Sequence, residues 1–342
     1  MQLKVTNIIQ ETPDAVTVCF KNGNFFKSIK YKPGQFIMLD FKINNQKVKR
    51  AYSFSSSPDV EKDLRITVKK VKGGLVSNFI NNELKVGDKV KLEAAMGSFF
   101  VEPDANRTQT YVLFGAGSGI TPVYSIAKSV LIKEPNSKVV LIYANQNKES
   151  IIFHDEISQL KARYSKKLFV ENVIGENDNP NYYTGFLTMD ILEDIFKKHQ
   201  LEFNTDNKYM MCGPAGFMDN SVKLLKEKGI ERNHIKLEAF KAAKVKVNRK
   251  DLVSKVTIKT QKGDFDMEVP GDKTILQTAM NNNIPIPYSC RSGMCSTCKG
   301  TCKDGEVTMS KGHFLTQDQV DAGEVLTCIT YPNSETLTIE LD

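Results

Sequence analysis

A chain of 342 residues, 40% of them hydrophobic and 25% charged, is long enough for two or three folded domains. The longest apolar runs, Tyr111–Phe114 and Val139–Ala144, are far shorter than the roughly 20 residues that cross a bilayer. The N-terminus also has no secretory signal, so we expect a cytoplasmic protein without a membrane partner.

The net charge of +7 is unevenly distributed. Residues 253–342 carry a net charge of −4, so residues 1–252 carry +11. Two interpretations stay open: the charge serves solubility, or a basic body attracts an acidic module across an interface. Nucleic-acid binding is disfavoured, because no basic segment is interleaved with aromatic residues.

Residues 1–104 have the pattern of a small antiparallel β-barrel. Glycine and proline turns separate short runs that are rich in β-branched and aromatic residues. These runs are Ala15–Phe20, Gln35–Phe41, Leu64–Lys70 and Lys89–Ala94.

Residues 105–240 alternate apolar strands with helical stretches, which predicts an α/β domain with a parallel sheet and helices on both faces. The predicted strands are Tyr111–Phe114, Val139–Tyr143, Leu168–Val173 and Tyr209–Cys212. The predicted helices run near Pro122–Lys133, His154–Tyr164, Thr188–Lys197 and Gly216–Lys228.

Residues 241–252 are polar and lysine-rich, which is typical of a linker. Residues 253–342 predict a small α+β domain. It begins with a strand pair around a Lys262-Gly263 turn and continues with a short helix near Thr274–Asn283. A cysteine-rich loop and a terminal strand, Thr336–Leu341, follow.

Four of the seven cysteines have the spacing of a plant-type [2Fe–2S] site. Three of them form C-x4-C-x2-C, and 29 residues separate the third from the fourth. The alternative is zinc, which more often binds paired C-x2-C knuckles, so iron is favoured. Small residues in this loop, Ser292, Gly293 and Ser296, leave backbone amides free to approach the sulfurs. Cys302 fits neither set of ligands and is predicted to be a spare thiol. The predicted ligands are Cys290, Cys295, Cys298 and Cys328.

Two glycine loops each join a predicted strand to a predicted helix. The first, Gly115–Pro122, reads Gly-Ala-Gly-Ser-Gly-Ile-Thr-Pro, and the second begins at Cys212-Gly213-Pro214. Glycines let the backbone approach a pyrophosphate, and a helix N-terminus attracts its negative charge. Each loop alone also fits an ordinary turn, but the pair favours a dinucleotide site.

A third motif, Arg50-Ala51-Tyr52-Ser53, lies in the barrel region. A guanidinium can hold a phosphate, a tyrosine can lie flat on an aromatic ring, and a serine can hydrogen-bond a ring nitrogen. An ordinary edge strand fits these residues equally well. Downstream, Gly73–Ser77 predicts a helix start whose free amides can bind a pyrophosphate.

These three motifs in this order resemble the ferredoxin–NADP reductase superfamily with a fused plant-type ferredoxin domain of the β-grasp type. The resemblance implies an oxidoreductase that uses NAD(P)H, FAD and a [2Fe–2S] cluster and passes electrons in that order to a partner oxygenase or hydroxylase. It also implies that Ser53, Cys212 and Phe240 are catalytic residues.

The resemblance also assigns the cofactor contacts. Those implied for the flavin are Arg50, Ala51, Tyr52, Ser53, Val68, Lys69, Gly74, Val76 and Ser77. Those implied for the nicotinamide dinucleotide are Gly117, Gly119, Thr121, Pro122, Cys212, Gly213 and Pro214. Glu238-Ala239-Phe240 resembles the family's E-x-F ending, in which Phe240 would cover the other face of the flavin; a core aromatic at a domain edge is the alternative.

A finer resemblance concerns the acceptor and the donor. Ser289–Gly300 and Gly323–Pro332 are similar to reductase components of phenylacetyl-CoA epoxidases, which implies a diiron acceptor. Two alternative acceptors stay open, a Rieske oxygenase and a hybrid-cluster protein. A non-catalytic role, as a redox sensor or a zinc-stapled module, also stays open.

NADPH-using relatives often have an arginine after the strand Val139–Tyr143, where this chain has Gln146. Lys148 can substitute for it, which slightly favours NADPH.

Overall fold

The structure is a computed structural model that describes residues 1–23, 28–44, 46–176, 178–240, 251–261, 263–288, 291–293, 297–310, 313 and 315–341. The chain divides into two compact units, Met1–Glu238 and Ala239–Asp342. The predicted boundary after residue 104 lies inside the first unit and stays a prediction, as does the linker, of which residues 241–250 lie outside the described residues.

The first half of unit 1 is an antiparallel β-barrel. Its strands are hydrogen-bonded in the order β4-β3-β6-β1-β2-β5. An antiparallel bridge between Phe54 and Ile66 joins the two edges, and the amide of Ser55 donates to the carbonyl of Arg65 at 2.8 Å. The predicted barrel is therefore confirmed. The strands are β1 (Gln2–Thr12), β2 (Ala15–Phe20), β3 (Phe36–Ile43), β4 (Gln46–Ser53), β5 (Leu64–Lys69) and β6 (Lys89–Met96).

Alternation of apolar residues along these strands fills the barrel. Val16, Val18 and Phe20 of β2 point inward with Ile66 and Val68 of β5, and all are almost fully buried. Helix α1 (Leu75–Asn82) is amphipathic and buries its apolar face against this core.

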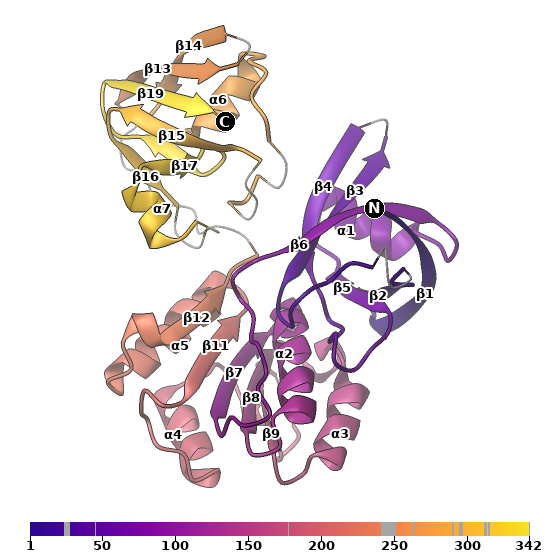
Figure 1. Cartoon of the computed structure of the whole chain (residues 1–342). Helices are drawn as coiled ribbons and strands as arrows, with labels where there is room; N and C mark the ends of the chain where they lie inside the picture. Colours follow the sequence, from indigo (N-terminus) through magenta and orange to yellow (C-terminus); the bar gives the residue numbers. More distant parts are fainter. Residues whose placement is uncertain are drawn as a thin grey trace. The chain divides into compact units, whose positions relative to one another are not determined.

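The second half of unit 1 is a parallel sheet with the order β10-β9-β8-β7-β11-β12. Figure 1 shows helices α2 and α3 on one face of this sheet and α4 and α5 on the other. The strands are β7 (Thr110–Ala116), β8 (Lys138–Asn145), β9 (Leu168–Ile174), β10 (Tyr183–Thr184), β11 (Lys208–Cys212) and β12 (Ile235–Glu238). The helices are α2 (Ile120–Lys133), α3 (His154–Arg163), α4 (Met189–Lys198) and α5 (Ala215–Glu227), with short 3-10 turns η1 (Gly117–Gly119), η2 (Lys148–Ser150) and η3 (Arg232–His234).

This strand order contains a topological switch point. From β7 the chain runs outward through β8 to β9, and β11 then returns to the other side of β7. Open α/β sheets bind ligands in the crevice beyond the carboxyl ends of the strands at such a point. The two glycine loops follow β7 and β11, so the fold places both at this crevice.

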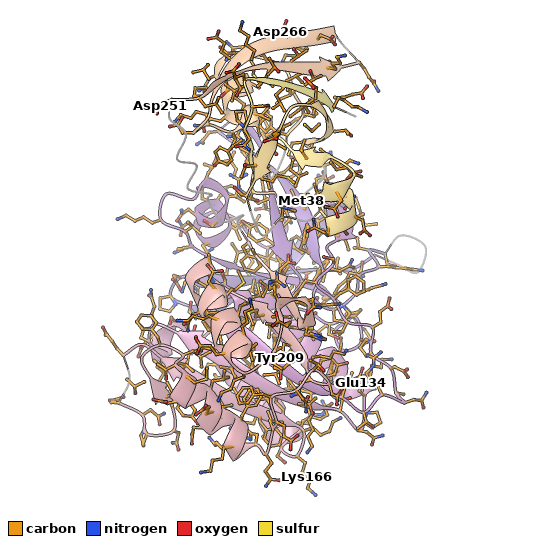
Figure 2. The ribbon with its side chains drawn as sticks, turned by 90° about the vertical axis from the view of Figure 1, so that its left-hand side faces the viewer. Met38, Glu134, Lys166, Tyr209, Asp251 and Asp266 are labelled. Atoms are coloured by element: carbon orange, nitrogen blue, oxygen red, sulfur yellow. The ribbon has the colours of Figure 1, made fainter. Side chains whose placement is uncertain are left out.

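A buried carboxylate secures the segment that enters this sheet. Glu134 is fully buried, and Figure 2 marks its position. Its carboxylate accepts hydrogen bonds from Arg107 (2.9 Å), Tyr111 (3.0 Å) and Ser137 (2.6 Å) and from the amide of Asp104 (3.1 Å). The chain between barrel and sheet is thereby held in one conformation.

Unit 2 contains a mixed five-stranded sheet, β14-β13-β19-β15-β17, and a small pair, β16-β18. Strands β13 and β19 are parallel and the other neighbours antiparallel. Strand β19 coincides with the predicted terminal strand, whereas Lys262 of the predicted turn lies outside the described residues. The elements are β13 (Val253–Thr260), β14 (Gly263–Pro270), α6 (Ile275–Asn281), β15 (Lys299–Asp304), β16 (Val307–Met309), α7 (Gln317–Asp321), β17 (Glu324–Leu326), β18 (Thr330–Pro332) and β19 (Thr336–Leu341).

In the part of the chain that the structure describes, no helix is both long enough and apolar enough to span a bilayer.

Candidate functional site

The predicted flavin motif occupies the end of β4. Ala51 pairs with Met38 of β3 and Ser53 with Phe36, so the motif is held by a full antiparallel ladder. Ser53 is 5% exposed. The half-buried Tyr52 packs against the barrel core, and burial raises the pKa of its hydroxyl, while nearby Arg50 lowers that pKa. The phenol therefore stays neutral well into the alkaline range.

The turn before α1 is tightly packed at Gly74 and leads into a helix N-terminus with free amides. A Cβ atom on Gly74 would lie 2.5 Å from the Ser77 hydroxyl, which itself accepts a hydrogen bond from the amide of Val71 at 3.1 Å. No side chain caps the N-terminus of this helix. Its first amides, including that of Val76, are thus available to an anion, and the helix dipole favours one. These features fit the diphosphate of FAD.

Val68 and Lys69 contribute differently from each other. The Val68 side chain points into the barrel and is 1% exposed, so only its backbone faces outward. Its carbonyl already accepts a hydrogen bond from the Asn81 amide at 3.1 Å. Lys69 is half-buried and lies 3.4 Å from the carboxylate of Asp14. Both residues stay predicted flavin contacts.

The two glycine loops pack directly on each other at the switch point. A Cβ on Gly119 would lie 2.1 Å from the Cys212 carbonyl oxygen, and one on Gly213 would lie 2.9 Å from Ala116. Thr121 is 2% exposed and donates its hydroxyl hydrogen to the Ser118 carbonyl at 3.0 Å, which fixes the first turn of α2 beside the buried ring of Pro122. The structure thus brings together two predicted segments about 95 residues apart.

Gly117 and Pro214 complete this crevice. Gly117 has a φ of +51°, which favours glycine, and nothing lies within 4 Å of the position of a Cβ there. Pro214 is the N-cap of α5, and no side chain caps that helix. Free backbone amides and open space at both loops fit the pyrophosphate of a dinucleotide.

Cys212 and Glu238 are partners in the register of β11 and β12. Cys212 is fully buried, and Glu238 is 6% exposed. Burial, and secondarily the neighbouring Glu238, raise the pKa of the Cys212 thiol well above its ordinary value. Burial also raises the pKa of Glu238 to about 8. At neutral pH both groups therefore hold their protons at the carboxyl edge of the sheet.

Phe240 lies two residues beyond β12. It is 40% exposed and belongs to the second compact unit, which begins at Ala239. Its predicted place over the flavin stays a prediction.

Two of the four predicted cluster cysteines lie in neighbouring buried segments of unit 2. Cys298 is 1% and Cys328 is 8% exposed, and both belong to one apolar cluster. The amide of Thr327 donates to the Cys298 carbonyl at 3.0 Å, so residues 29 positions apart in sequence are held together. Both cysteines are in turns, Cys298 just before β15 and Cys328 between β17 and β18, and two buried cysteines in adjoining turns fit part of the donor set of a [2Fe–2S] cluster.

Cys290, Cys295 and Ser296 lie outside the described residues, and within those residues no three His, Cys, Asp or Glu side chains gather as a metal site. Cys302 is in β15, where it pairs with Ile339, and its thiol contacts the carbonyls of Asp304 and Gly305 at 3.5 Å. Its role as a spare thiol stays a prediction.

Sequence reasoning missed two features. The amide of Glu176 donates to the Gln146 carbonyl at 3.0 Å, which brings an acidic residue beside the position considered for donor recognition. A buried Lys128–Glu61 ion pair joins α2 to the barrel. The signal for the pair was a lysine inside the mainly apolar run Ile126–Leu131, and the signal for Glu176 was its place just after a parallel strand.

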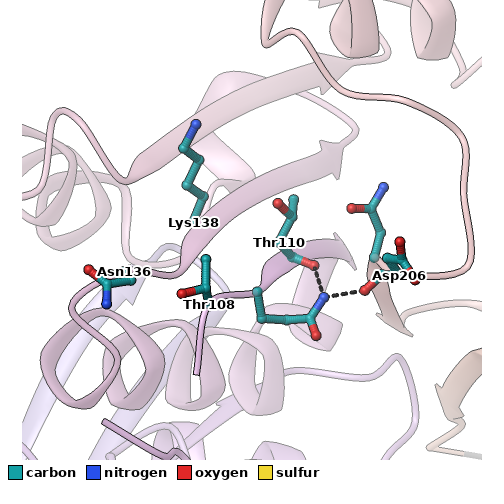
Figure 3. A pocket seen from close by; sticks show the side chains of 7 residues that line it. Thr108, Thr110, Asn136, Lys138 and Asp206 are labelled. Carbon is teal, nitrogen blue, oxygen red and sulfur yellow. Dashed lines mark hydrogen bonds between the residues drawn. The ribbon is translucent and has the colours of Figure 1, made fainter. Parts of the chain in front are cut away.

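A cavity of about 300 Å³ lies at the amino-terminal ends of the strands of the parallel sheet, away from the glycine loops. Figure 3 shows Thr110 and Lys138, the first residues of β7 and β8, in its wall with Asp206. The cofactor motifs are at the carboxyl ends of these strands, so this cavity is not part of the candidate site.

Comparison with known proteins matches three family models along the chain. An "Oxidoreductase FAD-binding domain" covers residues 2–101, an "Oxidoreductase NAD-binding domain" covers residues 113–223, and a "2Fe-2S iron-sulfur cluster binding domain" covers residues 258–333.

Relatives and a solved structure align over nearly their full length. The chain is 28% identical to one of the subunits of the 1,2-phenylacetyl-CoA epoxidase of Escherichia coli, over 99% of this chain and 97% of that one. It is 30% identical to the ferredoxin reductase component of 3-ketosteroid-9-alpha-monooxygenase of Rhodococcus rhodochrous, over 99% and 96% of the two chains. The solved structure of phthalate dioxygenase reductase matches with a TM-score of 0.64 at 20% identity, over 100% of this chain and 98% of that one. This last likeness confirms the predicted fold class.

Proposed function

Because this chain belongs to the ferredoxin–NADP reductase superfamily and joins FAD-binding, NAD-binding and 2Fe–2S domains, we propose that it is the reductase component of an oxygenase. It is an oxidoreductase that uses NAD(P)H, FAD and a [2Fe–2S] cluster. When bound, the flavin accepts a hydride and releases single electrons, which the iron–sulfur cluster passes to the acceptor. The paired glycine loops at the switch point, in one compact unit with the flavin motif, are the observation that carries the proposal.

The protein's own residues bind and orient the cofactors in this proposal. Arg50 holds a flavin phosphate, Tyr52 lies against the ring system, and the Ser53 hydroxyl donates a hydrogen bond to a ring nitrogen. The uncapped N-terminus of α1 binds the diphosphate of FAD, which its unsatisfied amides and the close approach at Gly74 support.

Two residues at the nicotinamide end of the crevice, Cys212 and Glu238, are protonated at neutral pH. Gly119, Thr121 and the turn at Cys212 orient the dinucleotide, and Glu238 holds a proton on its carboxyl at neutral pH. Because both the thiol and the carboxyl are uncharged there, neither places a negative charge beside the anionic dinucleotide. Phe240 is proposed to cover the ring face that Tyr52 leaves open.

The acceptor we propose is a diiron epoxidase that acts on phenylacetyl-CoA. The relative from Escherichia coli is by name a subunit of a 1,2-phenylacetyl-CoA epoxidase, and it aligns over almost the full length of both chains. A different oxygenase is the second candidate, because the relative from Rhodococcus rhodochrous, at 30% identity, belongs to a steroid monooxygenase.

Anaerobic titration with NADH and NADPH, followed by visible absorption and by EPR, tests this function. We expect bleaching of the flavin bands and then the EPR signal of a reduced [2Fe–2S] cluster. A purified protein without flavin or iron–sulfur absorption, or with stoichiometric zinc instead, would refute the proposal. Flavin that neither donor reduces would leave a redox sensor as the better interpretation. Oxygenase assays with candidate acceptors then separate the two acceptor proposals.

A cytoplasmic location is also part of the proposal. Clusters held by cysteine thiolates and reduced dinucleotides belong to a reducing compartment, and no disulfide joins the described cysteines.

A further inference from the structure

Helix α2 begins at the dinucleotide loop, and one of its faces is hydrogen-bonded to the barrel segment that follows the flavin motif. The Ser125 hydroxyl donates to the Ser56 carbonyl at 2.6 Å, and the hydroxyl oxygens of Ser57 and Ser129 are 2.5 Å apart. The Lys128 ammonium forms an ion pair with the Glu61 carboxylate. Positions three and four apart lie on one helix face. We call these residues the α2–barrel seam: Ser56, Ser57, Glu61, Ser125, Lys128 and Ser129.

The seam is almost completely removed from water. The side chain of Lys128 is 5% exposed and that of Glu61 is 13% exposed. The second oxygen of Glu61 accepts the amide hydrogen of Ser57 at 2.8 Å, and the Lys128 ammonium lies 4.5 Å from the centre of the Tyr124 ring. Both charges are therefore paired and further stabilised where they are buried.

Stability does not explain a buried pair of this kind. Taking two charges out of water is costly, and well-packed apolar residues in their place are often neutral or stabilising. Directional hydrogen bonds have a different effect, because they are satisfied in only one register of the two surfaces. Apolar contacts are less directional, so they specify the register of α2 against the barrel less strictly.

The register of this seam sets the position of the dinucleotide loop relative to the flavin motif. Ser56 and Glu61 lie on the chain just after Ser53 of the flavin motif, and Lys128 is two helical turns from Thr121 of the dinucleotide loop. A shift at the seam therefore moves one cofactor motif relative to the other. Hydride transfer requires reacting atoms about 3–3.5 Å apart, and a misplacement of about 1 Å can slow a reaction about 100-fold.

We propose that Lys128 and Glu61 are positioning residues for hydride transfer, which hold the dinucleotide loop in one register against the flavin-bearing strand. This inference rests on the proposed reductase function.

The test replaces the pair by apolar residues, as Lys128→Met with Glu61→Leu. Stopped-flow measurement of flavin reduction, with the donor that reduces the wild type faster, gives the limiting rate and the donor affinity separately. We expect the limiting rate to fall about 10-fold or more, with donor affinity within about twofold of wild type. Flavin content should be retained, and the thermal midpoint should fall by only a few degrees, because Glu61→Leu leaves the buried amide of Ser57 without its acceptor. A kinetic isotope effect with 4-deuterated donor should show that hydride transfer is the step that slowed.

The matched control is a second ion pair between the same two elements. Lys133 and Asp59 lie 3.6 Å apart, and the Lys133 side chain is 54% exposed. Lys133→Met with Asp59→Leu should leave the limiting rate unchanged, because an exposed pair fixes little. Equal slowing in this control would overturn the proposal.

A second variant and a further result with the apolar pair also test the proposal. If the apolar pair does not fold, Lys128→Arg keeps the charge and changes its geometry; a slower limiting rate supports positioning, and a wild-type rate overturns it. A flavin-bound apolar variant that reacts within about twofold of wild type also overturns it. Failure of the proposed function would instead appear as a wild-type flavin that neither donor reduces.

Discussion

Gly119 and Cys212 pack backbone to backbone, because a Cβ atom on Gly119 would stand 2.1 Å from the Cys212 carbonyl oxygen. No side-chain rearrangement relieves such a contact, so Gly119→Ala must push the two loops apart. We expect KM for the nicotinamide donor to rise about 10-fold or more and the free energy of unfolding to fall by about 1–3 kcal/mol. Steady-state kinetics and urea unfolding measure these two effects.

The control is Gly216→Ala, near the start of α5. No atom lies within 4 Å of the position of a Cβ at Gly216, so alanine fits without displacement. Its helix propensity should leave stability unchanged or raise it by up to about 1 kcal/mol. If both alanine variants bind the donor like wild type, the close packing of the loops has no role in binding.

Glu238 should make the first unit less stable as the pH rises. Burial raises its pKa to about 8, from an ordinary value of 4.5. Between these values the folded protein holds a proton that the unfolded chain has released, so the free energy of unfolding falls with increasing pH. The slope for one such group is at most about 1.4 kcal/mol per pH unit.

Glu238→Gln removes this contribution while keeping the shape of the side chain. Urea unfolding followed by circular dichroism, at several pH values from about 5.5 to 7.5, should show a flatter dependence in the variant than in wild type. Glu11, whose pKa burial raises to about 7, is present in both proteins and cancels in the comparison. Parallel curves for the two proteins would contradict an uncharged Glu238.

The cluster cysteines predict a selective loss of iron. Cys298→Ser and Cys328→Ser each remove a thiolate donor, so bound iron, sulfide and the EPR signal after dithionite reduction should be lost or strongly reduced. Flavin reduction by the nicotinamide donor should persist, because its motifs are in the other compact unit. Cys302→Ser is the matched control and should keep the cluster; its loss there would make Cys302 a ligand.

Most helices and strands of the parallel-sheet region were predictable, because the spacing of apolar residues indicates which face of an element is buried. The strand Tyr111–Phe114 and the helix near Pro122–Lys133 correspond to β7 and α2 within two residues at each end. Strand β10, with only two residues, gives no periodic pattern, and β12 is short and carries alternating charges. Motif spacing also predicted that the two glycine loops lie together, since loops after adjacent parallel strands meet at the carboxyl ends of those strands.

Long-range pairing of polar groups was not predictable. Lys128 on a helix is expected to face solvent, and only the packing of α2 between sheet and barrel buries it against Glu61. Glu176 follows β9 by two residues, and its position beside Gln146 depends on the register of β8 and β9. The sequence marked Lys128 and Glu176 as unusual, but it did not indicate which residue each of them would meet.

Glu176 should weaken the use of NADPH. Its amide is hydrogen-bonded to the Gln146 carbonyl at 3.0 Å, so its exposed carboxylate lies near the edge where NADPH-using relatives often have an arginine. A 2′-phosphate would meet that negative charge, whereas a 2′-hydroxyl can donate to it. Glu176→Gln should therefore raise kcat/KM for NADPH relative to NADH by about 5- to 10-fold, and adding Gln146→Arg should raise the ratio further. The gain should shrink at high salt, since the charges are exposed.

The control is Glu227→Gln on α5, which removes an exposed acid elsewhere and should not change the ratio of kcat/KM values for the two donors. A ratio that Glu176→Gln leaves at its wild-type value would place the adenosine ribose away from this edge.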